Sequence, residues 1–124
     1  MKIFIQILIL ICPLLAWNQH VYDSPVTQTW PSIFKSNYQE IKRTIAIEEN
    51  AIILSTENSK GKEFEILYIR KIERSNEEII YKCRTSGNKD ATVIIPAVGT
   101  VNRIDLYKAS AKTGEEIQYR FHIF

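Results

Sequence analysis

The sequence contains little of what specialised protein classes depend on. Its 124 residues include only two cysteines, four glycines and four prolines, and the formal net charge is only +2. With 45% hydrophobic and 24% charged residues, this composition excludes collagen-like and low-complexity chains and is typical of a globular domain. The nearly balanced charge lacks the concentrated basic footprint of a nucleic-acid binder. The length allows one domain and leaves no room for a second.

The longest hydrophobic run lies at the N-terminus. Lys2 supplies a positive charge, residues 3–11 are almost wholly aliphatic, and Pro13 breaks the run before Ala16. This is the plan of a secretory signal peptide, and the run is shorter than the about 20 residues of a transmembrane helix. We therefore expect residues 1–16 to be a signal peptide and the mature protein to be secreted or periplasmic, without a membrane span. A retained signal anchor is the alternative.

Removal of that segment leaves Cys83 as the only cysteine. A single cysteine cannot form an internal disulfide, so the hydrophobic core alone must hold the domain together. Cys83 alternates with Tyr81 on the apolar side of a predicted strand. We therefore expect a buried, unreactive thiol.

From about residue 41 the hydrophobic pattern has a period of two, interrupted by short polar turns. The alternation and the many isoleucines predict antiparallel strands. We predict an all-β fold, an antiparallel meander of about seven strands that forms a small sandwich or barrel over residues 30–124. The predicted strands cover residues 41–47, 51–56, 64–72, 79–83, 91–95, 101–108 and 117–124.

The segment before this domain has no regular pattern. Residues 17–29 are polar, which predicts an extended N-terminal arm. Trp30, Ile33 and Phe34 follow at helical spacing, and Thr29 is a suitable cap. This predicts one short helical turn whose aromatic side chains close an end of the β core.

The alternation also predicts which side chains face inward. One strand carries Phe64, Ile66 and Tyr68 on one face, and Arg70 continues that face. A buried arginine needs a partner, and a ligand carboxylate can supply one; we therefore assign Tyr68 and Arg70 as candidate ligand-binding residues. The alternatives are that Arg70 lies at a strand end and its side chain reaches solvent, or that a bulge turns it to the other face. The predicted core comprises Phe64, Ile66, Tyr68, Ile79, Tyr81, Tyr119 and Phe121.

An early tryptophan, Trp30, followed by a meander of hairpins resembles the lipocalin-like (calycin) β proteins, although Gln28 and Thr29 stand where that family has Gly-x before the tryptophan. This resemblance covers architecture alone. It implies a cup for a small apolar ligand.

Residues suited to catalysis are few. His20 lies in the predicted arm, and His122 falls on the polar face of the last strand without a nucleophile or acidic partner at a recognisable spacing. Neither histidine forms a zinc spacing with Cys83. We expect no enzymatic activity, no cofactor and no metal site; a small hydrolase would need partners brought together by folding.

The C-terminal third is mildly basic, and Arg103, Lys108 and Arg120 contribute to it. Such a patch suits an acidic protein partner. We therefore expect an exported, non-enzymatic binding module whose target is a small apolar ligand or a protein. The alternative is a periplasmic immunity protein or inhibitor that neutralises a partner protein, with these three residues in the contact.

Overall fold

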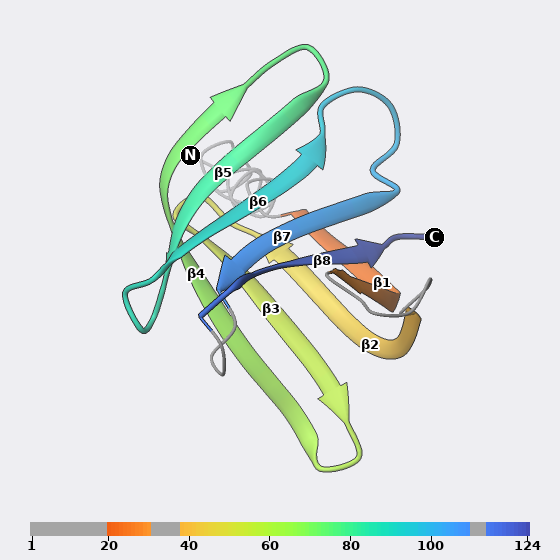
Figure 1. Cartoon of the computed structure of the whole chain (residues 1–124). Coiled ribbons are helices and arrows are strands. Elements are labelled where there is room, and N and C mark those ends of the chain that lie inside the picture. Colours follow the sequence, from red (N-terminus) through yellow and green to blue (C-terminus); the bar gives the residue numbers. More distant parts are fainter. Residues whose placement is uncertain (1–19, 31–37, 110–113) are drawn as a thin grey trace, which may run out of the picture.

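Alternation of apolar and polar side chains organises the chain into eight antiparallel strands, seen in a computed structural model (Figure 1). The structure describes residues 20–30, 38–109 and 114–124. The strands are β1 (His20–Trp30), β2 (Tyr38–Ile47), β3 (Ala51–Asn58), β4 (Gly61–Arg74), β5 (Glu78–Thr85), β6 (Asp90–Pro96), β7 (Arg103–Ala109) and β8 (Glu116–His122).

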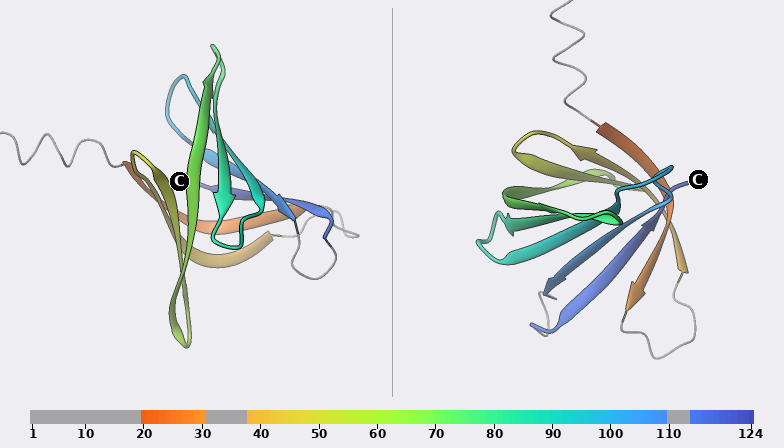
Figure 2. Two further views of the ribbon diagram at one scale, coloured as in Figure 1. Left: turned by 90° about the vertical axis from the view of Figure 1, so that its left-hand side faces the viewer. Right: turned by 90° about the horizontal axis from the view of Figure 1, so that it is seen from above.

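Each strand pairs with the next, and β1 pairs with β8, so the sheet closes into a barrel. Figure 2 shows the strands curving around one interior from two further directions. The predicted all-β antiparallel meander is confirmed, and its closed form is the barrel of the two predicted alternatives. No helix occurs in the described residues.

The barrel begins at His20, ten residues before the predicted start of the domain at residue 30. From His20 onward, the predicted arm is strand β1. Its inner side chains include Ser24 and Thr27, both buried, and the register with β2 shifts between Ser24 and Val26, at Pro25. A strand with polar inner residues and a proline bulge shows no apolar alternation, which is why its pattern was missed.

Only the first residues of the predicted helical turn lie in the described part of the chain, and they form a strand. Thr29 and Trp30 are the last residues of β1, paired with β8. The remainder, residues 31–34, lies outside the described residues, as do residues 1–19 with the predicted signal peptide.

The inner face of β4 is the opposite of the predicted one. Phe64 is 66% exposed and Tyr68 48% exposed, whereas Leu67 between them is fully buried. The register with β5 shifts between Ile69 and Lys71. The intervening Arg70 is exposed, as Phe64 and Tyr68 are. A bulge is present, but it turns Ile72 and Arg74, and not Arg70, to the other face.

The core fills the middle of the barrel. Tyr81 and Phe121 are buried in it as predicted, and Ile79 and Tyr119 pack against it. Eight-stranded barrels have interiors just wide enough to be filled by side chains or to hold one small ligand. The buried apolar residues are Ile45, Ile47, Ile52, Leu54, Leu67, Tyr81, Cys83, Ala91, Val93, Ile95, Ile104, Leu106 and Phe121.

Candidate functional site

A cavity of about 420 Å³ opens at the barrel end where β1 begins and where the β2–β3, β4–β5 and β6–β7 turns lie. We call it the cup. Its lining combines aliphatic side chains, two tyrosines and charged groups. The lining residues are His20, Tyr22, Ile47, Glu48, Glu49, Ile72, Arg74, Ile79, Tyr81, Ile95, Pro96, Ala97, Gly99 and Val101.

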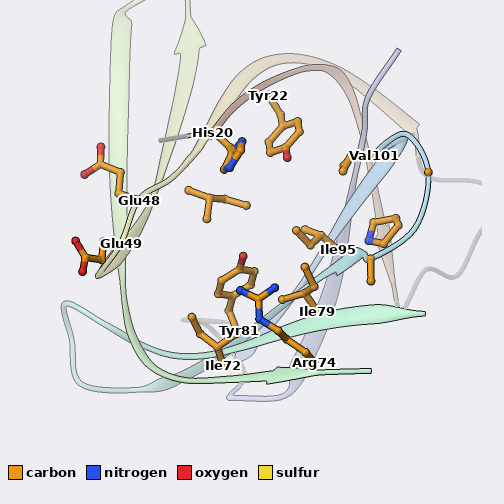
Figure 3. A pocket seen from close by; sticks show the side chains of 14 residues that line it. His20, Tyr22, Glu48, Glu49, Ile72, Arg74, Ile79, Tyr81, Ile95 and Val101 are labelled. Carbon is orange, nitrogen blue, oxygen red and sulfur yellow. The ribbon is translucent and has the colours of Figure 1, made fainter. Parts of the chain in front are cut away.

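Two tyrosines face each other across the cup (Figure 3). Tyr22 comes from β1 and Tyr81 from β5, and their hydroxyl ends point toward one another, with Arg74 from the end of β4 beside Tyr81. Burial raises the pKa of Tyr81, the Arg74 charge lowers it, and Tyr22 and Cys83 add smaller increases. The Tyr81 hydroxyl is therefore neutral at physiological pH and able to donate or accept a hydrogen bond.

The cup is closed below. Ile45, Ile52, Leu67 and Ile104 are fully buried in the centre of the barrel. Interiors of this kind are packed as densely as organic crystals. A molecule entering the cup therefore contacts Ile79, Ile95 and Val101 on its walls but does not pass through the barrel.

The two predicted ligand-binding residues lie outside this interior. Tyr68 is on the outer face of β4, and Arg70 is exposed at its bulge. The prediction assumed that the row from Phe64 to Tyr68 faced inward. Because that row faces solvent, Tyr68 and Arg70 are not part of the cup.

The three predicted partner-binding residues divide into two groups. Arg120 donates hydrogen bonds from Nε to Oδ1 of Asp105 at 2.8 Å and from Nη2 to Oδ2 at 3.3 Å. Arg103 Nε lies 3.9 Å from the same carboxylate, so these two arginines meet on the outer face of β7 and β8. Lys108 instead faces inward, with its Nζ 2.8 Å from both carboxylate oxygens of Glu65.

The outer group continues over aromatic side chains. The Arg120 guanidinium lies 5.3 Å from the Trp30 ring centroid, and the His122 ring lies 5.7 Å from that of Tyr38. The hydrogen bond to Asp105 raises the pKa of Arg120, and burial opposes that shift. We call Trp30, Tyr38, Arg103, Asp105, Arg120 and His122 the outer patch.

The groups considered for catalysis stay apart. His122 Nε2 lies 3.2 Å from the amide oxygen of Gln28 on the outer patch, and burial lowers its pKa. Cys83 is buried as predicted, and burial raises its pKa to about 11. Within residues 20–30, 38–109 and 114–124, no cluster of three His, Cys, Asp or Glu side chains is able to hold a metal ion, and no helix is long and apolar enough to cross a membrane.

The sequence analysis missed two polar residues of the cup, Tyr22 and Arg74, and an interior arginine, Arg43. Tyr22 lies in the segment that was predicted to be an extended arm. Arg74 lies after the bulge, which reverses the inward and outward positions of the residues that follow it in β4. Arg43 had a usable signal, because it stands between Ile41 and Ile45 on the inward-facing period of β2.

No family model matches the sequence, and neither a curated protein nor a solved structure is significantly similar to it. The closed eight-stranded meander is consistent with a calycin-like architecture. It assigns the chain to no family, so function has to be argued from the residues themselves.

Proposed function

We propose that this protein is an exported, non-enzymatic binding module that holds a small amphipathic molecule in the cup. The observation that carries the proposal is a hollow of about 420 Å³ above a densely packed core, lined by aliphatic side chains, two tyrosines and several charged groups. Ligand sites typically have volumes of about 300–1,000 Å³ and a few convergent polar groups that fix the orientation of the ligand, and the cup has both.

The lining indicates how such a ligand lies. Its apolar part contacts Ile79, Ile95 and Val101, which line the cup from β5, β6 and the β6–β7 turn. Its polar group accepts hydrogen bonds from the hydroxyls of Tyr22 and Tyr81. These hydroxyls point to the centre of the cup (Figure 3), so they set orientation while the aliphatic walls supply the burial of apolar surface.

A solvatochromic dye, 8-anilinonaphthalene-1-sulfonate, tests the proposal with the mature protein. We expect a saturable, one-to-one rise in fluorescence. Val101→Trp fills the cup and is expected to abolish that rise. Val98→Trp is the matched control, because Val98 is in the same turn but 73% exposed. Equal dye binding by both variants, or none by the wild type, contradicts the proposal.

Export is part of the proposal and rests on the signal-like segment of residues 1–16. N-terminal sequencing of protein recovered from outside the cytoplasm tests it. A mature N-terminus near residue 17 is expected. A membrane-bound product that still begins with Met1 contradicts it.

The outer patch favours a second candidate function. In this alternative the protein is an inhibitor or immunity protein that binds and neutralises a partner protein. Tryptophan, tyrosine and arginine dominate binding energy at protein interfaces, and the patch contains Trp30, Tyr38, Arg103 and Arg120 on one face. Its two arginines and one aspartate leave one excess positive charge, which suits an acidic partner. A stable complex in the exported fraction that Trp30→Ala disrupts and Val101→Trp does not is the expected result.

A further inference from the structure

Arg43 is an arginine inside the barrel, at the end opposite the cup. Its Nε donates to the hydroxyl of Thr27 and its Nη1 to that of Thr56, both at 3.0 Å, and its guanidinium lies 5.3 Å from the Phe121 ring centroid. Burial lowers the pKa of Arg43, and Tyr119 and Glu65 partly offset this. Arginine nevertheless stays protonated in proteins, so a positive charge is held here by neutral hydroxyls.

The neighbouring carboxylate of Glu65 is paired with Lys108. Both oxygens of Glu65 lie 2.8 Å from Lys108 Nζ, and among the described residues no carboxylate lies within 4.0 Å of the Arg43 guanidinium. Arg43 and Lys108 against Glu65 leave one excess positive charge. A charge withdrawn from water without a counter-charge is costly, so this end of the barrel favours an anion.

Space for an anion exists beside these groups. A cavity of about 180 Å³ is lined by Arg43, Glu65, Lys108 and Tyr119 together with Leu54, Leu106 and Phe121. One water occupies about 30 Å³ of the liquid, so the cavity holds more than a single solvent molecule. Of the five N–H donors of a guanidinium, two are directed at Thr27 and Thr56, which leaves donors for a bidentate contact.

We propose that this cavity is a second binding site, separate from the cup, for a short-chain monocarboxylate. The carboxylate accepts two parallel hydrogen bonds from the Arg43 guanidinium. This bidentate geometry is the one in which arginine binds carboxylates most strongly. Leu54, Leu106 and Phe121 surround the aliphatic part. The single excess charge and these three apolar side chains suit a singly charged acid with a short tail, and not inorganic phosphate. The buried centre of the barrel separates the site from the cup.

Isothermal titration calorimetry of the mature protein with butyrate, and with inorganic phosphate in parallel, tests the ligand class. We expect butyrate to bind with a stoichiometry of one and phosphate to bind at least tenfold more weakly. Removing a hydrogen bond to a charged group costs about 1.5–3 kcal/mol, so Arg43→Gln is expected to weaken butyrate binding about ten- to a hundredfold. Unchanged affinity in this variant, or equal affinity for phosphate, overturns the proposal.

Glu65→Gln distinguishes a binding site from a purely structural cluster of Arg43, Glu65 and Lys108. It removes the negative charge that competes with the ligand and frees Lys108, so butyrate affinity is expected to rise. A fall in affinity, in protein whose circular dichroism shows the native fold, contradicts the proposal. This variant also keeps the test decisive if Arg43→Gln fails to fold.

The cup provides the control for location. Arg74→Gln changes the cup's arginine and is expected to leave butyrate binding unchanged. If Arg74→Gln abolishes binding and Arg43→Gln does not, butyrate occupies the cup, and the second site is refuted while the cup is supported. If dye binding in the cup fails but butyrate binding responds to Arg43→Gln, the second site stands without the cup.

Discussion

Strands β4 and β8 lie opposite each other in the closed order of the barrel, yet only one revealed its inner face in the sequence. In β8 the row containing Tyr119 and Phe121 is apolar and the alternate row containing Arg120 is polar, and the apolar row is inside. In β4 both rows contain large apolar residues. Hydrophobic alternation identifies a face only when the other face is polar.

The structure shows which face of β4 is inside. With Tyr68 inside, unbroken alternation would place Arg70 inside as well. The observed register instead buries Leu67, so Arg70 faces solvent as Tyr68 does. The accompanying cost is an inward Glu65, which Lys108 of β7 neutralises. The inward carboxylate of Glu65 is thus paired, and the guanidinium of Arg70 remains exposed to solvent.

The largest expected effect comes from the inner face of β8. Phe121 is 1% exposed, so Phe121→Ala is expected to lower the free energy of unfolding by about 3–5 kcal/mol through lost burial and a cavity. Urea denaturation measures it. The same change at exposed Phe64 of β4 is expected to cost within about 0.5 kcal/mol. Comparable losses at both positions would mean that β4 presents Phe64 to the interior.

Two adjacent residues of β4 give the next largest contrast. Leu67→Ala is expected to cost about 2–5 kcal/mol because Leu67 is fully buried. Tyr68→Ala, on the outer face, is expected to cost less than about 1 kcal/mol. The pair is measured by thermal and urea unfolding. A larger loss at Tyr68 than at Leu67 would reverse the assignment of faces.

Cys83, which pairs with Ile69 of β4, reports on the same interior through pH. Folding raises the pKa of its thiol from 9.0 to about 11, so the folded state holds the proton more tightly. Stability from this group is complete below pH 9 and is lost as pH rises to 11, by about 2–3 kcal/mol at 1.4 kcal/mol per unit. Urea denaturation from pH 8 to 11 measures the loss.

The control for that titration is Cys83→Ala. The quantity compared is the slope of the free energy of unfolding against pH, and not its absolute value. The slope between pH 9 and 11 is expected to be smaller than in the wild type. Burial also raises the pKa of Tyr81, so part of the loss remains. An unchanged slope would mean that the thiol is not shielded from solvent.

The outer face of β8 gives the smallest effect. Asp105 is buried beneath Arg103 and Arg120, and Asp105→Asn is expected to cost about 1–2 kcal/mol because it weakens charged hydrogen bonds. The exposed pair Arg84–Asp90 is the matched control, and Asp90→Asn is expected to cost under about 0.5 kcal/mol. Equal costs would show that the outer patch is an ordinary solvated surface.

The sequence was sufficient for the fold class and for seven of the strands, because period-two patterns and polar turns are local signals. It was insufficient for β1, whose inner Ser24 and Thr27 are polar. The candidate sites depend on contacts between distant strands. Tyr22 and Tyr81 meet across the cup, and Lys108 reaches Glu65, only because the barrel closes. No spacing in the sequence carries that information.

Closure of the barrel also imposes an order of events on the growing chain. Val26 pairs with His122, so the first strand to be synthesised lacks one of its two neighbours until the last strand has been made. Until then β1 and β7 both present unpaired backbone edges, which are templates for intermolecular pairing. A chain interrupted before β8 therefore loses more than one strand: it becomes an open sheet with two adhesive edges, prone to aggregation during biosynthesis.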